Sequence, residues 1–247
     1  MESLLPDKYS FEARVVPVLI VCLPVVVGVA AWSDSLTLPA WLFGATMLSL
    51  LGVWLGHVGR ERGKRIEPGL YASWGGGRST ARLRCKPGEN EDRPALDARR
   101  RCAVALLPGT RFPNEEDELQ DALKADAVYD RAVGAMFERT RGNVVVESAN
   151  RAYGFYRNSL GLKPIGLASA TLGVALVVAR LWWTHERTGT LDVDALPYLF
   201  GALACAAWHV LGVNQQAVRR QNERLADALY RAVESLNLPV TPPLQLR

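Results

Sequence analysis

The stretches VVPVLIVCLPVVVGVAAW (residues 15–32) and LPAWLFGATMLSLLGVWLG (residues 38–56) are 18 and 19 residues long and carry no charged side chain. A helix needs roughly 20 apolar residues to cross about 30 Å of hydrocarbon, so each stretch predicts a transmembrane span. Because only residues 33–37 separate them, the pair predicts a helical hairpin rather than a signal peptide with GVAAW as its cleavage site.

The same pattern returns near the C-terminus, in IGLASATLGVALVVARLWW (165–183) and LPYLFGALACAAWHVLGV (196–213). We therefore expect an all-α membrane protein with two transmembrane helical hairpins, an inserted α-rich cytosolic domain and a C-terminal cytosolic helix. The expected boundaries are 1–14 for an N-terminal cytosolic segment, 15–57 and 164–213 for the two hairpins, 58–163 for the inserted domain, and 214–247 for the last helix and tail.

Basic residues are distributed unevenly around these spans. The 33–37 turn has no Lys or Arg and the 184–195 turn has one, whereas 20 of the 29 fall in 58–163 and five follow residue 213. Since Lys and Arg near helix ends are retained in the cytoplasm, we expect a bacterial inner-membrane protein with both termini and the 58–163 domain cytoplasmic. The interfacial tryptophans then fall into an inner set, Trp54 and Trp208, and an outer set, Trp32, Trp41, Trp182 and Trp183.

The inserted domain begins with a polar stretch, 59–94, whose many Gly and Pro residues predict strand and loop structure. Helices are expected at 94–107 and from Asn114 to about Arg141, where four acidic residues suit the start of a helix. A further helix is expected over 145–157, before Pro164 opens the third span. The helix expected from Asn114 to Arg141 should face the core with one apolar stripe, formed by Leu119, Leu123, Ala127, Val133 and Phe137.

A basic loop in this domain is the candidate ligand site. Three glycines, 75–77, stand between an aromatic side chain and a basic cluster, and the expected ligand residues are Trp74, Arg78, Arg82, Arg84 and Lys86. Such a loop can offer N–H groups and guanidinium groups to phosphate while the indole stacks on a base. The predicted partner is a nucleotide or short single-stranded DNA, and the alternative is a basic loop that faces solvent or lipid headgroups.

The sequence does not favour an enzyme. No Ser/His/Asp, Cys/His or paired-carboxylate arrangement stands out, and the loop lacks the G-x-x-x-x-G-K-[ST] pattern of a nucleotide-hydrolysing P-loop. Cys85 and Cys102 lack a C-x-x-C pair or a neighbouring His, so neither a metal nor another cofactor is expected, and in a reducing cytosol both should remain free thiols.

Two arginines are candidates for pore lining or gating. Arg157 lies in the aromatic stretch YGFYRN (153–158) that leads into the third span, where an interfacial elbow that anchors the helix is the simpler interpretation. Arg180 lies inside the third span near Trp183, where it either extends its guanidinium to the outer interface or faces a pore.

Self-association is expected from two further patterns. Gly166/Ala170 and Gly201/Cys205 are each four residues apart, and small residues at this spacing allow close helix contact in lipid. The helix after the fourth span carries a partly polar heptad seam that includes Asn222, Leu225 and Leu229. This seam fits either a homo-oligomer or packing against the cytosolic domain.

Three stretches, LPDKYSFEARVVP (5–17), GKRIEPGLYASWGGGRSTARLR (63–84) and ANRAYGFYRNSLGLKPIGL (149–167), resemble a family of uncharacterised bacterial multi-pass membrane proteins. That family has Pro-Thr-Thr after Trp-Gly-Gly, where this chain has Gly77-Arg78-Ser79. The architecture also resembles the HalA-type ion-channel effectors of Hailong anti-phage defence. This resemblance implies an oligomeric channel whose cytosolic part binds a short DNA signal made by a partner nucleotidyltransferase.

The expected function is therefore that of an oligomeric inner-membrane effector resembling an ion channel and gated by its cytosolic domain in anti-phage defence. The alternative is a non-conducting membrane anchor or scaffold that recruits a cytosolic partner.

Overall fold

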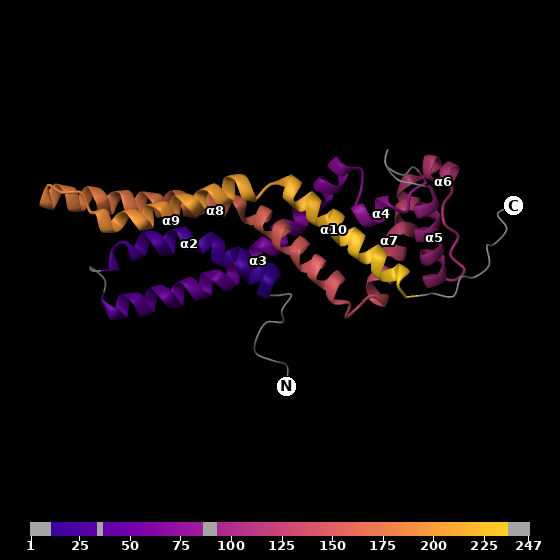
Figure 1. Ribbon diagram of the computed structural model, residues 1–247, viewed down its shortest axis with the longest axis horizontal. Coiled ribbons are helices and arrows are strands. Elements are labelled where there is room, and N and C mark those ends of the chain that lie inside the picture. The colour runs from indigo at the N-terminus through magenta and orange to yellow at the C-terminus, as the bar shows by residue number, and fades with distance from the viewer. Residues whose placement is uncertain (1–10, 34–36, 86–92, 237–247) are drawn as a thin grey trace, which may run out of the picture. The chain divides into compact units, whose positions relative to one another are not determined.

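The structure, a computed structural model, describes residues 11–33, 37–85 and 93–236, and within these ranges it contains helices and turns but no strand (Figure 1). The longer helices are α2 (Val16–Ala30), α3 (Leu38–Trp74), α5 (Arg93–Leu106), α7 (Ala122–Arg139), α8 (Val144–Thr188), α9 (Leu196–Ala207) and α10 (Gln215–Glu234). The short ones are α4 (Arg78–Ala81), α6 (Glu115–Gln120), the 3-10 turn η3 (Val193–Ala195), and the π-helical turns η1 (Phe11–Val15) and η4 (Trp208–Gly212).

Four helical segments of the described chain are long and apolar enough to cross a membrane. They are η1 with α2, the segment beginning with α3, α8, and η3 with α9 and η4. This confirms the four apolar helices predicted from the sequence. Pro17 and Pro197 lie in the first turn of α2 and of α9, each directly after a short helical turn, η1 or η3.

The chain divides into two compact units. Unit 1 comprises Met1–Pro68 and Arg151–Val218, and unit 2 comprises Gly69–Asn150 and Arg219–Arg247. Unit 1 therefore holds the four apolar segments, and unit 2 holds most of the predicted 58–163 domain together with most of α10.

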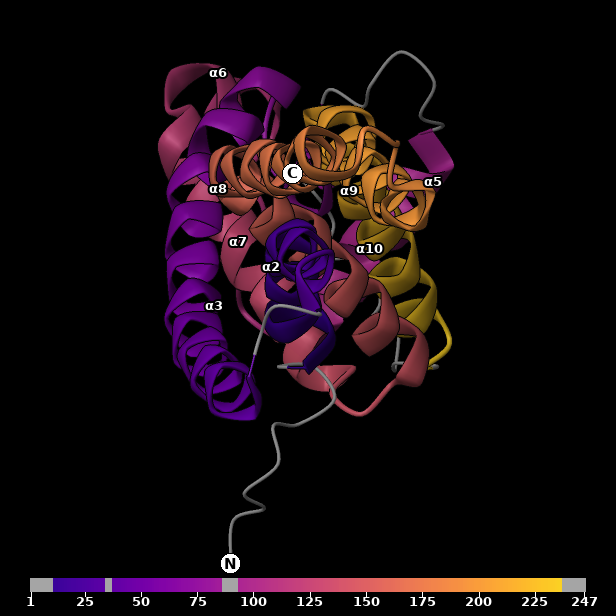
Figure 2. The ribbon, with the colours of Figure 1, turned by 90° about the vertical axis from the view of Figure 1, so that its left-hand side faces the viewer.

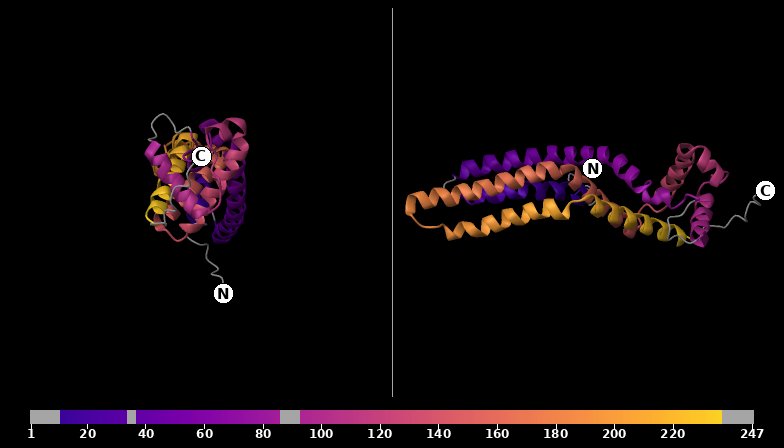
Figure 3. Two further views of the ribbon diagram at one scale, coloured as in Figure 1. Left: turned by 90° about the vertical axis from the view of Figure 1, so that its right-hand side faces the viewer. Right: turned by 90° about the horizontal axis from the view of Figure 1, so that it is seen from above.

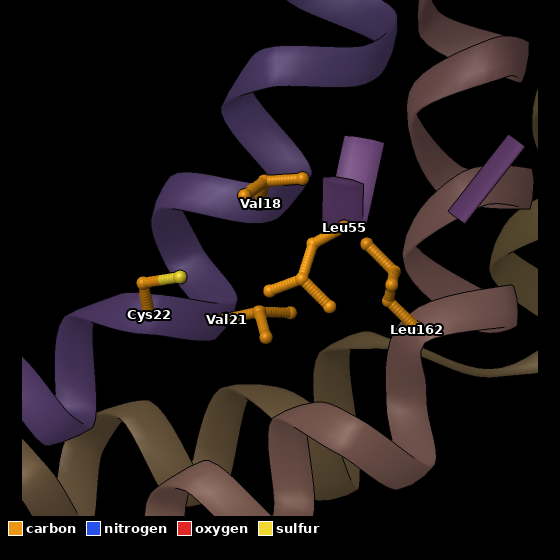
Figure 4. Close-up of a cluster of buried hydrophobic side chains, with 5 residues drawn as sticks. All are labelled: Val18, Val21, Cys22, Leu55 and Leu162. Atoms are coloured by element: carbon orange, nitrogen blue, oxygen red, sulfur yellow. The ribbon is translucent and has the colours of Figure 1, made fainter. Parts of the chain in front are cut away.

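Within unit 1, α2 and α8 lie between α3 and α9 (Figures 2 and 3). A cluster of buried apolar side chains joins α2, α3 and α8, formed by Val18, Val21, Cys22, Leu55 and Leu162 (Figure 4). Where α2 crosses α8 the backbones nearly touch, because a Cβ added at Gly173 would lie 2.3 Å from Pro24 O. Glycine is required at this crossing.

The prediction of strand and loop over 59–94 is wrong for its first part, because α3 continues to Trp74. The glycines that suggested loops serve helix packing instead. A Cβ at Gly59 would lie 2.8 Å from Leu162 Cδ1, and one at Gly63 would lie 2.8 Å from Asn158 Oδ1, so both glycines face α8. The expected boundary at Pro164 is also absent, since α8 passes through this exposed proline without ending.

The helix predicted from Asn114 to Arg141 is broken into α6 and α7. Asn114 begins α6 with a capping box that includes Asp117, and Asp121 ends α6 while its side chain accepts a hydrogen bond from Lys124 N at the start of α7. The predicted core stripe is also wrong, because α7 turns a different side of the helix inward: Leu119 is 71% exposed and Leu123 85%. The buried stripe of α7 is instead Ala125, Tyr129, Ala132 and Met136.

Two predicted helices of unit 2 are confirmed with small shifts. The helix expected at 94–107 is α5, and the helix expected after the fourth span is α10. Asn214 begins α10, because its Oδ1 accepts a hydrogen bond of 2.9 Å from Ala217 N.

Candidate functional site

The arginine loop, residues 74–84, begins where α3 ends. Gly75 and Gly76 have φ values of +76° and +117°, a region that other residues avoid, and Gly76 N donates to Tyr71 O at 2.8 Å. The chain then turns into α4. The two glycines thus end α3. Arg78, Arg82 and Arg84 follow in α4 and in the residues directly after it.

All three arginines of this loop face carboxylates of unit 2. The closest contacts are Arg78 Nε to Glu223 Oε1 at 3.4 Å, Arg82 Nη1 to Asp227 Oδ1 at 2.5 Å, and Arg84 Nη2 to Asp126 Oδ2 at 2.7 Å. Arg84 also donates from Nε to Asp126 Oδ1 at 3.0 Å, so its pairing is bidentate. The guanidinium groups predicted to bind phosphate are therefore held by α7 and α10.

Other contacts fix α4 in the same place. Thr80 Oγ1 donates to Asp130 Oδ1 at 2.7 Å, and Tyr230 Oη donates to Ser79 O at 2.5 Å. Trp74 is half-buried, with its ring 6.0 Å from that of Tyr71. Its role as a base-stacking platform stays a prediction, and Lys86 lies outside the described residues.

Arg100 is the centre of a polar network that the sequence did not reveal. Its Nε and Nη2 atoms donate to Leu83 O at 2.8 and 2.6 Å, and Nη2 also lies 2.7 Å from Tyr129 Oη. Tyr129 is fully buried and donates to the Glu118 carboxylate. Burial, and next the hydrogen bond to Glu118, raise the pKa of Tyr129 far above its usual range, so its hydroxyl stays a donor.

A cleft of about 290 Å³ adjoins this network and the arginine loop. Its charged lining consists of Arg84, Glu115, Glu118 and Asp126. Three carboxylates against one guanidinium repel a polyanion, so phosphate does not fit this cleft unless it replaces a carboxylate at Arg84.

A second cluster, the polar junction, lies in unit 1 where the polar part of α3 meets α8. Arg157 Nη1 donates to both Glu67 oxygens at 3.2 and 3.1 Å, and Tyr153 Oη donates to Glu67 Oε1 at 2.5 Å. The Arg157 guanidinium also lies over the Tyr153 ring, 5.6 Å from its centre. Both members of the ion pair are largely shielded from solvent, with side-chain exposures of 13% for Arg157 and 20% for Glu67.

The N-terminal turn η1 joins the same junction. Asn158 Nδ2 donates to Ala13 O at 2.7 Å, and Arg151 Nε pairs with Glu12 Oε2 at 2.9 Å. The three sequence stretches 5–17, 63–84 and 149–167 therefore meet here in space through residues of η1, α3 and α8. Gly161 completes the contact, because a Cβ there would lie 2.6 Å from Gly63 N.

The two predicted pore or gating residues both have acidic partners. Arg157 belongs to the polar junction, and Arg180 Nε lies 3.2 Å from Asp192 Oδ2, with its guanidinium 5.7 Å from the centre of the Trp32 ring. Neither of them is an isolated charge among apolar side chains. Lys163, which sequence reasoning passed over, donates to Val213 O at 2.7 Å and so satisfies a carbonyl at the end of η4.

The residues predicted for self-association are largely packed within one chain. A Cβ at Gly166 would lie 2.1 Å from His209 Cδ2, and Ala170 is 2% exposed. In α10, Asn222 donates to Tyr71 Oη at 3.4 Å, and Leu225 and Leu229 are buried. Gly201 and Cys205 are half-buried, so this pair alone retains surface for a second copy.

Across the described ranges, no group of three or more His, Cys, Asp or Glu side chains is placed to hold a metal ion. Among the predicted site residues, the geometry brings together two ion-paired clusters, the arginine loop and the polar junction. Comparison of the chain with family models, with curated proteins and with solved structures gave no match.

Proposed function

We propose that this chain is an oligomeric, ion-channel-like effector of a bacterial inner membrane, which acts in anti-phage defence and is gated by its cytosolic domain. The observation that carries the proposal is one compact unit with four apolar segments of membrane-spanning length, accompanied by a second compact unit made of charged helices. Membrane insertion with both termini and the 58–163 domain in the cytoplasm follows from the distribution of Lys and Arg.

One chain leaves apolar surface of its spanning segments uncovered, so surface is available for further copies of the chain as well as for lipid. Only 6% of the most apolar window of the second segment is buried within the chain, and 17% of that of the fourth. The space between α2, α3 and α8 is filled by apolar side chains such as Leu55 and Leu162. A conducting path would therefore lie between copies rather than through one chain.

The paired state of the arginine loop suggests how an anionic signal acts on it. A nucleotide or short DNA would replace Asp126, Asp227 and Glu223 as the partner of the three arginines and so release α4 from α7 and α10. Phosphate is a strong competitor because it accepts bidentate hydrogen bonds from guanidinium. A partner nucleotidyltransferase is the expected source of such a signal.

Binding of a fluorescent short oligonucleotide to the purified full-length protein tests this site by anisotropy. Arg82→Gln/Arg84→Gln should weaken binding and flatten its salt dependence, by about 0.7 in the slope of log K against log salt for each phosphate that is no longer neutralised. Asp126→Asn/Asp227→Asn should act in the opposite direction and tighten binding, because it removes the competing carboxylates. Trp74→Ala should weaken binding with little change in slope.

The matched control is Arg131→Gln/Arg139→Gln, which removes two exposed arginines of α7. If the Arg82/Arg84 variant binds like this control, the loop is not the ligand site and its arginines serve only to hold α4.

Conductance across a planar bilayer containing the reconstituted protein tests the channel function itself. The proposal expects single-channel currents that change when the oligonucleotide is added to the cytoplasmic side. The competing function, a non-conducting anchor or scaffold, expects silent bilayers although the protein is inserted. If the protein is a channel, Arg157→Gln should alter the open fraction by freeing α3 from α8, whereas Arg139→Gln, on exposed surface of α7, should not.

A further inference from the structure

The part of α3 that follows its apolar segment carries four basic side chains within six residues, Arg60, Arg62, Lys64 and Arg65, here named the basic segment. Arg60 is half-buried and the other three are exposed. Glu61 is the only acid among these residues, which leaves a net charge of +3 (four basic residues minus one acid) on this turn and a half of helix.

Several half-buried arginines elsewhere in the chain are neutralised by carboxylates. Arg84, Arg157 and Arg180 each pair with a carboxylate at 2.7 to 3.2 Å. As far as the chain is described, no member of the basic segment has such a partner. The basic segment is therefore available to bind an anionic molecule outside the chain.

Lys64 and Arg65 lie on the same side of α3 as an exposed apolar surface, further along the helix. Phe43, Leu50 and Trp54 are 67%, 61% and 58% exposed and lie within one sector of α3. Lys64 and Arg65 continue that sector, because Gly59 and Gly63 direct the opposite side of the helix toward α8. At 1.5 Å per residue, Arg60 lies about 9 Å and Lys64 about 15 Å beyond Trp54 along the axis.

We propose that the basic segment binds the phosphate headgroups of anionic phospholipids. An interfacial Trp54 places the Arg60 to Arg65 charges at or just beyond the headgroup layer, within reach of long side chains that extend back toward it. Basic residues next to a span attract anionic lipid, and each contributes roughly a fivefold gain in affinity. The inference rests on the membrane insertion in the proposed function but does not depend on conduction.

The test is native mass spectrometry of the full-length protein in detergent, titrated with phosphatidylglycerol or with zwitterionic phosphatidylcholine. Lys64→Gln/Arg65→Gln should weaken phosphatidylglycerol binding roughly 25-fold, as expected for two charges at roughly fivefold each. Binding of phosphatidylcholine should not change. Arg60 and Arg62 remain in this variant, so the signal that orients the hairpin is retained.

Two controls separate a lipid site from a general effect of charge or folding. Arg131→Gln/Arg139→Gln removes the same charge from exposed positions of α7 and should bind lipid like the parent. The charge-preserving variant Lys64→Arg/Arg65→Lys should also bind like the parent, which shows that the positions tolerate substitution.

Equal phosphatidylglycerol binding by the parent and the Lys64/Arg65 variant would overturn the inference. So would an equal loss in the α7 control, since the effect would then come from net charge alone. Loss of oligonucleotide binding without loss of lipid binding would assign the segment to nucleic acid instead. A silent bilayer with lipid selectivity intact would refute the channel function and leave the lipid site standing.

Discussion

Replacing Gly161 with alanine tests the closest approach of α3 and α8. The added Cβ would lie 2.6 Å from Gly63 N and 3.0 Å from Gly59 O, both backbone atoms that cannot rotate away. Ordinary contact begins at 3.4 Å, so the two helices must separate by about 0.8 Å at this point (3.4 minus 2.6). Overpacking of this kind costs about 1–3 kcal/mol.

For a chain of this length each kcal/mol lowers the midpoint of thermal unfolding, Tm, by roughly 2–4 °C, which gives a fall of roughly 2–12 °C. Tm is read from tryptophan fluorescence of the detergent-solubilised protein at one fixed heating rate. The matched control is Gly69→Ala, also on these helices, where the described residues place nothing within 4 Å of the new Cβ. Alanine there should raise Tm, because it is the better helix former by about 1 kcal/mol.

The two variants therefore should move Tm in opposite directions. If Gly161→Ala unfolds at or above the Tm of the parent, as Gly69→Ala should, the close crossing of α3 and α8 does not exist in the folded protein.

Three further predictions concern other parts of the chain. Folding raises the pKa of Tyr129, so its hydroxyl stabilises the protein below the unfolded pKa of about 10, and this contribution is lost as the pH rises above that value. Between pH 8 and pH 11, Tyr129→Phe should therefore lose less stability than the parent, as measured by denaturant titration. A cysteine at Thr190, in a background lacking native thiols, should react with a membrane-impermeant reagent applied to intact cells and one at Ser79 should not; labelling of Ser79 would reverse the topology. Glu67→Gln should cost on the order of 1–3 kcal/mol by leaving Arg157 without its carboxylate, and the double variant with Arg157→Gln should cost less than the sum of the single ones, whereas additive costs would mean that the pair does not interact.

The apolar segments were predictable because their signal is local: a run of 18 or 19 residues without charge needs no knowledge of neighbouring helices. The extent of α3 and α8 was not, since glycine and proline favour loops by their own propensity. Gly59 and Gly63 lie four residues apart, the same small-residue spacing used to predict contacts in the third and fourth spans, and this signal was available for α3.

The acidic partners of the arginine loop could not be predicted from the sequence. Its basic residues and glycine turn are visible as a cluster, but Asp227 lies 145 residues from Arg82 and Asp126 lies 42 from Arg84. No local pattern relates such positions. The Arg100 network could not be predicted either. Its acceptors include the backbone carbonyl of Leu83, and every residue has such a carbonyl, so the residue type gives no sign of this contact.

The ion pair of Arg180 and Asp192 restricts how this protein can evolve. Both side chains are less than 20% exposed, and in the proposed orientation they lie at the outer end of the third span. A lineage that lost only one of them would keep an uncompensated charge beside hydrocarbon, and selection would remove it. Homologous chains should therefore carry both residues or neither. A chain with an apolar residue at position 180 should have no acidic residue at position 192.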